Sequence, residues 1–484
     1  MSLRSHSFKE RRGRGRLAVV VAIVLLVAGV SSLPAFADQV DDRLEALERA
    51  ITALQAELAA LRAERAAEQQ PPRPGAPATT GAVEQRLSEV ERRQEIQAEE
   101  IERLDLGPAV VGATEGLYGL GDAASKVYRV EQGLSIGGYG EMLFESIDST
   151  RDDGSPSGVR DRFDFLRGVL YTGYKFNDEW VFNSEIEVEH ASTGSGGEVS
   201  LEFAYVDRLL QPGVNARAGL LLVPMGFVNE IHEPPLFLGA KRPDTERVII
   251  PTTWRENGLG IFGEAGPFTY RTYMVNGLRA DAFTSSGLRS GRQKGAQAIA
   301  EDFAWVGRLD YTATPGLLAG ASVYAGDSGQ GLRDASRNEI DAQTTIVEGH
   351  VDWEWRGLEA RALYAEASID DVARLNQVLN LTGSRSIGES LEGYYVQLGY
   401  DLFAHRDAGG ARALIPYARW EFFDTQAEVP TGFSRDPARE VESFTLGIGF
   451  RPIDQVIFKL DHQDFDNEAG TGIDQWNVSL GYLF

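Results

Sequence analysis

The sequence predicts a sixteen-stranded antiparallel transmembrane β-barrel preceded by a short α-helical coiled-coil stalk. From residue 133 onward, apolar side chains recur at every second position, which is the period of a β-strand. The connections between these segments alternate between short and long, as in barrels with tight turns on one side of a membrane and loops on the other. Between residues 38 and 106, the apolar residues instead follow the heptad spacing of coiled coils.

Composition limits what can hold the chain together. The 484 residues include no Cys and carry a formal net charge of -25. Disulfides and a lipidated N-terminal cysteine are therefore excluded, and the acidic charge argues against nucleic acid as a partner. No apolar run reaches the roughly 18 to 20 residues of a spanning helix, but barrel strands alternate polar and apolar residues and so have a hydrophilic average.

Residues 1–37 have the features of a secretory signal peptide. Basic residues precede the apolar run "LAVVVAIVLLVAGV", and Ala35-Phe36-Ala37 supplies a small-x-small cleavage pattern. The alternative is an uncleaved anchor, but a helix of this run would be only about 21 Å long, shorter than a bilayer core of about 30 Å. We therefore expect export and cleavage near Ala37.

Residues 38–69 predict a first coiled coil. Opposite charges flank its seam at the positions that pair in a parallel coil, Arg43 with Glu48 and Glu57 with Arg62, which favours a parallel oligomer over a solitary amphipathic helix. The mixture of Leu and Ile in the seam does not distinguish two strands from three. The seam residues are Val40, Leu44, Leu47, Ile51, Leu54, Leu58 and Leu61.

A Pro-rich linker at residues 70–82 separates this coil from a second one at 83–106, which has glutamines in its two central layers. A Gly-rich linker at 107–132 then leads to the barrel domain at 133–484, and "GLYGLG" is interpreted as part of that linker. Each coil is too short to form a core of its own, so the two together predict a stalk that holds subunits together.

Sixteen alternating segments predict the barrel strands, and their even number leaves both ends on the same, periplasmic side. The longest connection, 224–255, follows the fifth segment and is the third long loop. The segments are 133–146, 160–176, 178–191, 199–210, 213–223, 256–264, 267–276, 300–313, 316–326, 345–355, 357–369, 390–403, 412–425, 440–451, 454–465 and 473–484.

The second segment does not keep a single alternation. Phe163 and Phe165 share parity with Arg167, which would place the arginine in lipid. Since a charge there is costly, we predict a β-bulge near Phe165 and Leu166 that turns Arg167 into the lumen.

A sixteen-stranded barrel is wide enough for an aqueous channel. The loop 224–255 contains apolar segments that would be costly on an outer surface, so we expect it to fold into the lumen as a constriction; the alternative is a loop that caps a subunit interface. The candidate residues of this loop are Glu230, His232, Glu233, Lys241, Arg242, Arg247 and Arg255, and the candidate luminal bases on strands are Arg167, Arg271, Arg308, Arg361, Arg419 and Lys459.

The next long loop carries a basic group. Such a group can guide anions toward a channel, but it can equally be a solvated loop or a contact for lipopolysaccharide phosphates. Its members are Arg279, Arg289, Arg292 and Lys294.

Residues 133–484 resemble the outer-membrane porins grouped with the phosphate-selective porins O and P, in a branch bearing an N-terminal coiled coil. The resemblance rests on "LSIGGYGE", "FLRGVLYTGYKFNDEWVFNSEIEVEH", "AYVDRLLQPGVNARAGLLLVPMGFVNE" and the final "GYLF". It implies a trimeric sixteen-stranded channel with an inward third loop. Anion selectivity in the name-giving members uses inward Arg and Lys, but luminal acids such as Glu185, Glu187 and Asp461 oppose them here, so phosphate selectivity does not carry over by resemblance alone.

Enzymatic function is not predicted. The histidines lack metal-ligand spacing, no Ser nucleophile elbow is present, and "DFDNEAGTGID" departs from a calcium loop, so neither a metal site nor a cofactor is expected.

The terminal "WNVSLGYLF" places its large apolar residues on one parity, so we expect the last strand to close against the first near Leu134. It also resembles the sorting signal that the barrel assembly machinery recognises, in an outer membrane of a Gram-negative bacterium with the coiled coil in the periplasm. The residues of this signal are Trp476, Val478, Leu480, Tyr482 and Phe484.

Two functions remain open. The first is a porin for passive diffusion of small hydrophilic solutes or ions, with a preference for anions or phosphate as an open option, as a homotrimer in contact with membrane lipids and lipopolysaccharide. The second is a structural or adhesive protein whose coiled coil tethers or spaces the cell envelope. The charges of the sequence do not determine the ion preference, because selectivity depends on the charges at the narrowest point.

Overall fold

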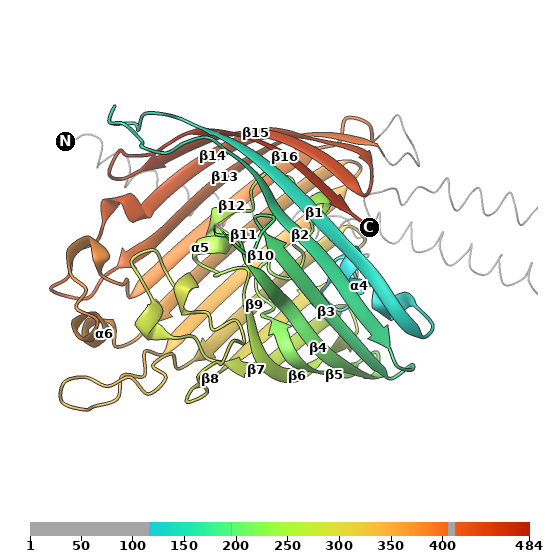
Figure 1. The fold of residues 1–484 in the computed structure, drawn as a ribbon, viewed down its shortest axis with the longest axis horizontal. Coiled ribbons are helices and arrows are strands. Elements are labelled where there is room, and N and C mark those ends of the chain that lie inside the picture. Colours follow the sequence, from blue (N-terminus) through green and yellow to red (C-terminus); the bar gives the residue numbers. More distant parts are fainter. Residues whose placement is uncertain (1–115, 195, 405–411) are drawn as a thin grey trace, which may run out of the picture. The chain divides into compact units, whose positions relative to one another are not determined.

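The computed structural model describes residues 116–194, 196–404 and 412–484 (Figure 1). The predicted signal peptide, both coiled coils, the Pro-rich linker and residues 107–115 lie outside the described residues, so those predictions remain predictions.

Sixteen antiparallel strands form one closed barrel in which each strand pairs with its neighbours in sequence and β1 pairs with β16. This confirms the predicted barrel, and the strand ends agree with the predicted segments to within three residues. The strands are β1 (Gly133–Ile147), β2 (Arg162–Lys175), β3 (Trp180–Glu189), β4 (Val199–Gln211), β5 (Val214–Leu222), β6 (Arg255–Ala265), β7 (Phe268–Asn276), β8 (Phe303–Tyr311), β9 (Leu317–Gly326), β10 (Thr344–Trp355), β11 (Leu358–Ile369), β12 (Ser390–Tyr400), β13 (Ala413–Glu428), β14 (Glu440–Ile453), β15 (Val456–Asn467) and β16 (Gln475–Leu483).

Short helices occupy the connections. Among the described residues, no helix has both the length and the apolar character needed to cross a membrane. The helices are α4 (Asp122–Arg129), η2 (Pro234–Leu236), α5 (Asp244–Val248), η3 (Ala280–Ala282), η4 (Arg289–Gly291), α6 (Val372–Val378), η5 (Gly383–Arg385) and η6 (Pro437–Arg439).

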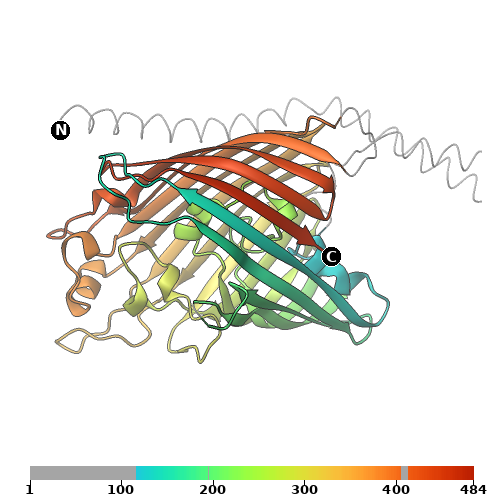
Figure 2. The ribbon, with the colours of Figure 1, turned by 45° about the horizontal axis from the view of Figure 1, so that its top comes forward.

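The barrel closes between Tyr139, which lies opposite Leu483, and Ile147, which lies opposite Gln475. The expected closure near Leu134 is therefore wrong by five residues. The physical reason is the difference in strand length, since β1 has 15 residues and β16 has nine. The first residues of β1 pair with β2 alone, and the chain's C-terminal end lies beside the middle of β1 (Figure 2).

The barrel carries its apolar side chains outward. On β14, Phe444 and Leu446 are exposed while the intervening Thr445 is 1% exposed and points inward. The same parity holds on β1, where Leu134 is 63% exposed and Glu141 is buried. An apolar outer surface around a polar interior is the reverse of a soluble domain and matches a lipid-facing band.

The bulge in β2 lies where the alternation predicts it. Glu141 of β1 lies opposite Arg167, but Leu143 lies opposite Asp164, so β2 contains one extra residue in this interval. The bulge turns Arg167 inward, where its guanidinium forms ion pairs of 3.2 Å with Glu141 and 3.3 Å with Glu187.

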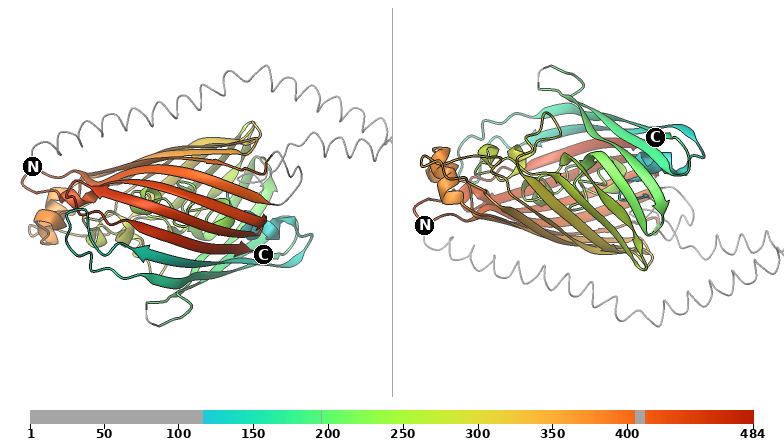
Figure 3. Two further views of the ribbon diagram at one scale, coloured as in Figure 1. Left: turned by 90° about the horizontal axis from the view of Figure 1, so that it is seen from above. Right: turned by 90° about the horizontal axis from the view of Figure 1, so that it is seen from below.

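The predicted Gly-rich linker contains a helix that the sequence did not reveal. Helix α4 packs at the turn end of the barrel, where the C-terminus also lies (Figure 2), and its Ala123, Val127 and Tyr128 are buried. The views from above and below also place α4 beside the first strands (Figure 3). Interpreting 116–132 as a simple linker is therefore wrong, because this part of the chain is packed against the barrel wall.

The register predicts how much a charged residue on the outer face destabilises the barrel. The loss of folding free energy should be larger near the middle of a strand than near its end. Leu259 near the middle of β6 and Leu134 at the start of β1 are both 63% exposed. In a bilayer, Leu259→Arg should destabilise the barrel by about 2 to 4 kcal/mol, whereas Leu134→Arg near the interface should cost about 0 to 1 kcal/mol. Denaturant unfolding in lipid vesicles measures both, and equal costs would contradict a lipid-facing band.

Candidate functional site

The loop between β5 and β6, residues 223–254, is called L3. It reaches the far wall of the barrel, where the backbone N–H of Ala240 donates to Asp461 of β15 at 2.7 Å. The N–H groups of Asp244 and Thr245 donate to Glu421 of β13 at 2.9 and 3.1 Å. These carboxylates face inward, so L3 crosses the lumen and does not cap a subunit interface.

Side chains at the base of L3 fix where it leaves the wall. The amide of Asn229 donates to the carbonyls of Val223 and Trp254 at 2.6 and 2.9 Å and accepts from the N–H of Trp254 at 2.6 Å. These bonds tie the first residue of the loop to its last, and Trp254 is fully buried beneath them.

The return half of L3 is fixed by the buried carboxylate of Glu246. This group accepts hydrogen bonds from the backbone N–H groups of Phe227 and Val228, each at 2.8 Å, and from the hydroxyl of Tyr395 on β12 at 2.7 Å. One buried acid therefore joins both halves of the loop to the wall.

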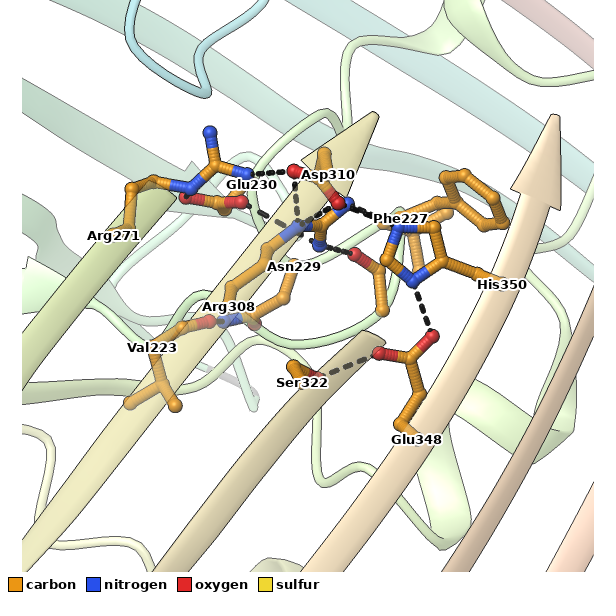
Figure 4. A network of polar contacts seen from close by, with 12 residues as sticks. Val223, Phe227, Asn229, Glu230, Arg271, Arg308, Asp310, Ser322, Glu348 and His350 are labelled. Carbon is orange, nitrogen blue, oxygen red and sulfur yellow. Dashed lines mark hydrogen bonds and ion pairs between the residues drawn. The ribbon is translucent and has the colours of Figure 1, made fainter. Parts of the chain in front are cut away.

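A network of charges joins L3 to β7, β8 and β10 (Figure 4). Asp310 binds Arg271 at 2.5 Å, Arg308 at 2.8 Å and His350 at 2.8 Å, while Glu230 of L3 lies 3.2 Å from Arg271. All five side chains are at most 8% exposed. Buried charges of this kind are stable only when paired, so the network fixes the loop against this wall.

His350 extends the same network to a further acid. Its second ring nitrogen contacts Glu348 at 2.6 Å, and Glu348 accepts a hydrogen bond from Ser322 at 2.6 Å. Because acids outnumber arginines in the network, a protonated His350 between Asp310 and Glu348 would balance its charge.

Most of the predicted luminal bases point inward but are not free to meet a solute. Arg271 and Arg308 belong to the network, and Lys459 donates to the carbonyl of Gly239 at 2.9 Å over the ring of Phe237. Other pairs are Arg255 with Glu202 at 2.6 Å, Arg361 with Asp352 at 2.6 Å, Lys241 with Glu145 at 2.9 Å, and Arg419 with the carbonyl of Lys241 at 3.4 Å. Carboxylates and loop carbonyls therefore occupy the guanidinium and ammonium groups at these positions, and a role for them in the channel stays a prediction.

The two remaining L3 candidates, His232 and Glu233, lie on the side of β1 to β3. His232 contacts Glu185 of β3 at 3.1 Å, and its ring lies edge-on to Tyr139. Glu233 accepts a hydrogen bond from the N–H of Ala124 in α4 at 3.1 Å. Its other carboxylate oxygen is buried without a hydrogen-bond partner among the described residues, and burial raises the pKa of Glu233 to about 7.

Four arginines differ from these paired bases, and we call them the arginine cluster: Arg242 and Arg247 from L3, and Arg289 and Arg292 from the loop 277–302, called L4. Burial, together with the positive charges of the other three members, lowers the pKa of Arg289 to about 9. Burial also lowers the pKa of Arg292 to about 10, and the positive charge of Arg255 contributes to this lowering. These shifts indicate that the four positive charges lie near one another.

The cluster is only partly neutralised. Arg247 pairs with Asp244, Arg242 donates to the carbonyl of His232 at 3.3 Å, and Arg292 donates to the carbonyl of Pro251 at 3.2 Å. One terminal nitrogen of Arg289, Nη1, is buried without a hydrogen-bond partner among the described residues. An uncompensated guanidinium among other cations favours an anion.

The predicted basic group of L4 is divided by the structure. Arg289 and Arg292 join the arginine cluster, but Arg279 pairs with Asp281 at 2.8 Å on an exposed part of the loop, and Lys294 lies 3.7 Å from Glu198. Arg279 and Lys294 are therefore paired with acids, and a shared role for all four bases stays a prediction.

A hollow of about 340 Å³ lies between L3 and the loop ends of β13 to β15. Lys241, Asp244 and Arg247 line it on the L3 side, and Phe423 and Phe465 line it on the barrel side. The arginine cluster therefore adjoins a space that opens toward the long loops.

The fold and these contacts define a closed sixteen-stranded barrel with an apolar outer face and a lumen crossed by its own third loop. No family model matches the sequence. An uncharacterized protein of Aquifex aeolicus (strain VF5) is 35% identical over 377 residues, which cover 76% of this chain and 83% of that protein. The chain belongs to the same family as this Aquifex aeolicus protein.

Among solved structures, the chain is similar to an anion-selective porin from Comamonas acidovorans, with 13% identity and a TM-score of 0.44 over 73% of this chain and 100% of that one. It is also similar to Salmonella typhi OmpF in complex with daunomycin, with 12% identity and a TM-score of 0.46 over 73% and 98% of the two chains. Similarity at this level does not indicate what the chain transports.

Removing the central acid of the network should be far more costly than removing an exposed one. Asp310→Ala removes the carboxylate that two buried arginines share, leaving them with Glu230, and should cost about 3 to 5 kcal/mol. Asp281→Ala breaks the exposed pair with Arg279 and should cost at most about 1 kcal/mol. Denaturant unfolding in detergent compares the two, and similar costs would show that the network does not hold L3.

Glu233 should make stability depend on pH. Its pKa is raised to about 7 in the folded chain, so its contribution is fully present below the unfolded pKa and is lost as pH rises through 7. This loss should be on the order of 3 kcal/mol between pH 4.5 and 8. Unfolding free energies across that range should show a flatter profile for Glu233→Gln. The exposed substitution Glu339→Gln should leave the wild-type profile unchanged, and a profile unaltered by Glu233→Gln would contradict the assignment.

Proposed function

We propose that the chain is an outer-membrane porin for passive diffusion of small hydrophilic solutes, with L3 as its constriction. The observation that carries this proposal is the crossing of a polar lumen by L3 inside a barrel whose outer face is apolar. Solutes would enter from the hollow beside L3 and meet the arginine cluster where L3 and L4 approach each other.

We further propose that the channel prefers anions, including oxyanions such as phosphate. Charges at a constriction act at short range in a low-dielectric surround, so they outweigh the net charge of -25 carried by the whole chain. Guanidinium groups suit oxyanions because their N–H groups match two oxygens at once. Glu187 lies near Arg242 and Glu189 lies near Arg289 and Arg292, so acids of β3 partly offset the cluster and the preference should be moderate.

The proposal extends to assembly and location. The predicted coiled coils would lie in the periplasm and hold a homotrimer together, and the terminal strand of alternating apolar residues would be recognised by the barrel assembly machinery. The basic and acidic loops would meet lipopolysaccharide at the cell surface.

A structural or adhesive role is the second candidate. Many luminal charges are buried in ion pairs. This favours the structural role, because a barrel with a filled lumen can still anchor the stalk in the membrane. This role requires no conducting path.

Planar-bilayer recording with the purified full-length protein tests the first proposal against the second. A porin should insert in discrete conductance steps, grouped in threes for a trimer. Insertion that is proven by protease protection but remains electrically silent would overturn the channel.

The arginine cluster should control ion preference. The double variant Arg242→Gln with Arg289→Gln should shift the reversal potential in a KCl gradient toward cation preference, because two positive charges leave the constriction. Arg279→Gln, which removes an exposed charge already paired with Asp281, is the matched control and should leave the potential unchanged. An unchanged potential in the double variant would contradict the assignment.

A further inference from the structure

Residues 116–130, called the plug segment, lie inside the turn end of the barrel. Tyr118 packs edge-on against Phe262, whose side chain points inward from β6, and against Tyr128 of α4. Both Val127 and Tyr128 are buried, at 2% and 9% exposure. The segment thus occupies lumen space between the periplasmic side and the constriction.

Polar groups of the wall hold the plug segment in place. Asn183 of β3 donates to the carbonyl of Ala124 at 2.9 Å. The hydroxyl of Tyr128 donates to Asp207 of β4 at 2.7 Å and accepts from Arg217 of β5 at 3.2 Å. Asp207 and Arg217 are themselves a buried ion pair of 2.8 Å, so Tyr128 docks onto a fixed charge pair.

The wall is shaped to receive the helix. At Gly173 of β2, a Cβ atom would lie 2.6 Å from the Cβ of Val127, and at Gly137 of β1 it would lie 2.9 Å from the carbonyl oxygen of Ala123. Larger residues at these two inward positions would displace α4. Glycine at both leaves a groove that fits the helix.

The plug segment also touches the constriction loop directly. Glu233 of L3 receives the N–H of Ala124, and a Cβ at Gly121 would collide with the same carboxylate at 2.3 Å. A Cβ at Gly119 would lie 2.7 Å from Glu230 and 2.8 Å from Arg271. Withdrawal of the segment would therefore uncover two acids of L3.

Several features make the segment able to leave. Helix α4 has only eight residues and no side-chain cap at Gly121, and an isolated helix of this length is unstable in water. Gly133 at the start of β1 has φ +101°, a backbone conformation that glycine adopts more readily than other residues. Lys126 and Arg129 keep one face of the helix exposed. The side-chain polar bonds that hold α4 come from only a few groups, chiefly Asn183, Glu233 and the Asp207–Arg217 pair.

We propose that the plug segment is a gate that closes the turn end of the lumen and must leave its groove for full conductance. This inference rests on the proposed channel function. Because the segment contacts Glu230 and Glu233, its departure also releases L3 from two of its contacts, which couples the gate to the constriction.

A reversible disulfide tests the gate in the full-length chain, which has no cysteine of its own. In the double variant Val127→Cys with Gly173→Cys, the two Cβ atoms start 2.6 Å apart, so a small outward shift of α4 reaches disulfide geometry. The single variants Val127→Cys and Gly173→Cys are the matched controls. Mass spectrometry verifies the bond before recording.

The oxidised double variant should show only low-conductance events in planar bilayers, and reduction should add larger openings that the oxidised form lacks. The single variants should not respond to oxidation or reduction. Equal conductance in the two forms would overturn the gate alone, while a reduced protein that inserts silently would overturn the channel and the gate together.

A second variant tests the gate without a disulfide. Asn183→Ala with Tyr128→Phe removes three of the polar bonds that hold α4 while leaving L3 and the arginine cluster intact. Large openings should become more frequent than in the wild type. An unchanged frequency would contradict the assignment of these contacts as the holding points of the gate.

Discussion

The contact of L3 with inward-facing carboxylates of the far wall is the interaction on which the interior of this barrel depends. A sixteen-stranded barrel is too wide for its own side chains to fill, so another part of the chain must satisfy the polar wall. Backbone N–H groups of L3 do so at Asp461 and Glu421. These hydrogen bonds satisfy the two buried carboxylates. They also fix the loop, because the carboxylates belong to the strands of the barrel wall.

This arrangement determines which charges remain for function. Asp310 and its partners are neutralised inside the wall, so they supply stability and position but no binding site. The arginine cluster differs because it forms between two loops, and burial and mutual repulsion lower the pKa of Arg289 and Arg292 despite nearby acids such as Glu202 and Glu256. Arg289 is the clearest case, because its Nη1 has no hydrogen-bond partner in the part of the chain that the structure describes. The proposed anion site therefore falls where the scaffold leaves positive charge only partly compensated.

Much of the fold could be predicted from the sequence, because strand alternation is a local property. Even the bulge at Phe165 followed from the cost of placing Arg167 in lipid. The candidate site could not be predicted to the same depth, since its pairs join residues such as Ala240 and Asp461 that lie 221 positions apart. Inward parity identified the bases but not their partners, although Asp310 shares that parity with Arg308. Helix α4 could not be predicted from the sequence, because its eight residues, flanked by glycines, are too few to show a helical periodicity of apolar residues.

Hydrogen exchange of L3 amides tests the docking of the loop most directly. Peptides covering residues 239–246 should exchange about as slowly as the strands, because the N–H groups of Ala240, Asp244 and Thr245 bond to buried carboxylates. The exposed loop 331–339 supplies the fast reference within the same sample. Exchange of residues 239–246 at the rate of that loop would contradict a third loop fixed inside the barrel, and with it the account of the lumen.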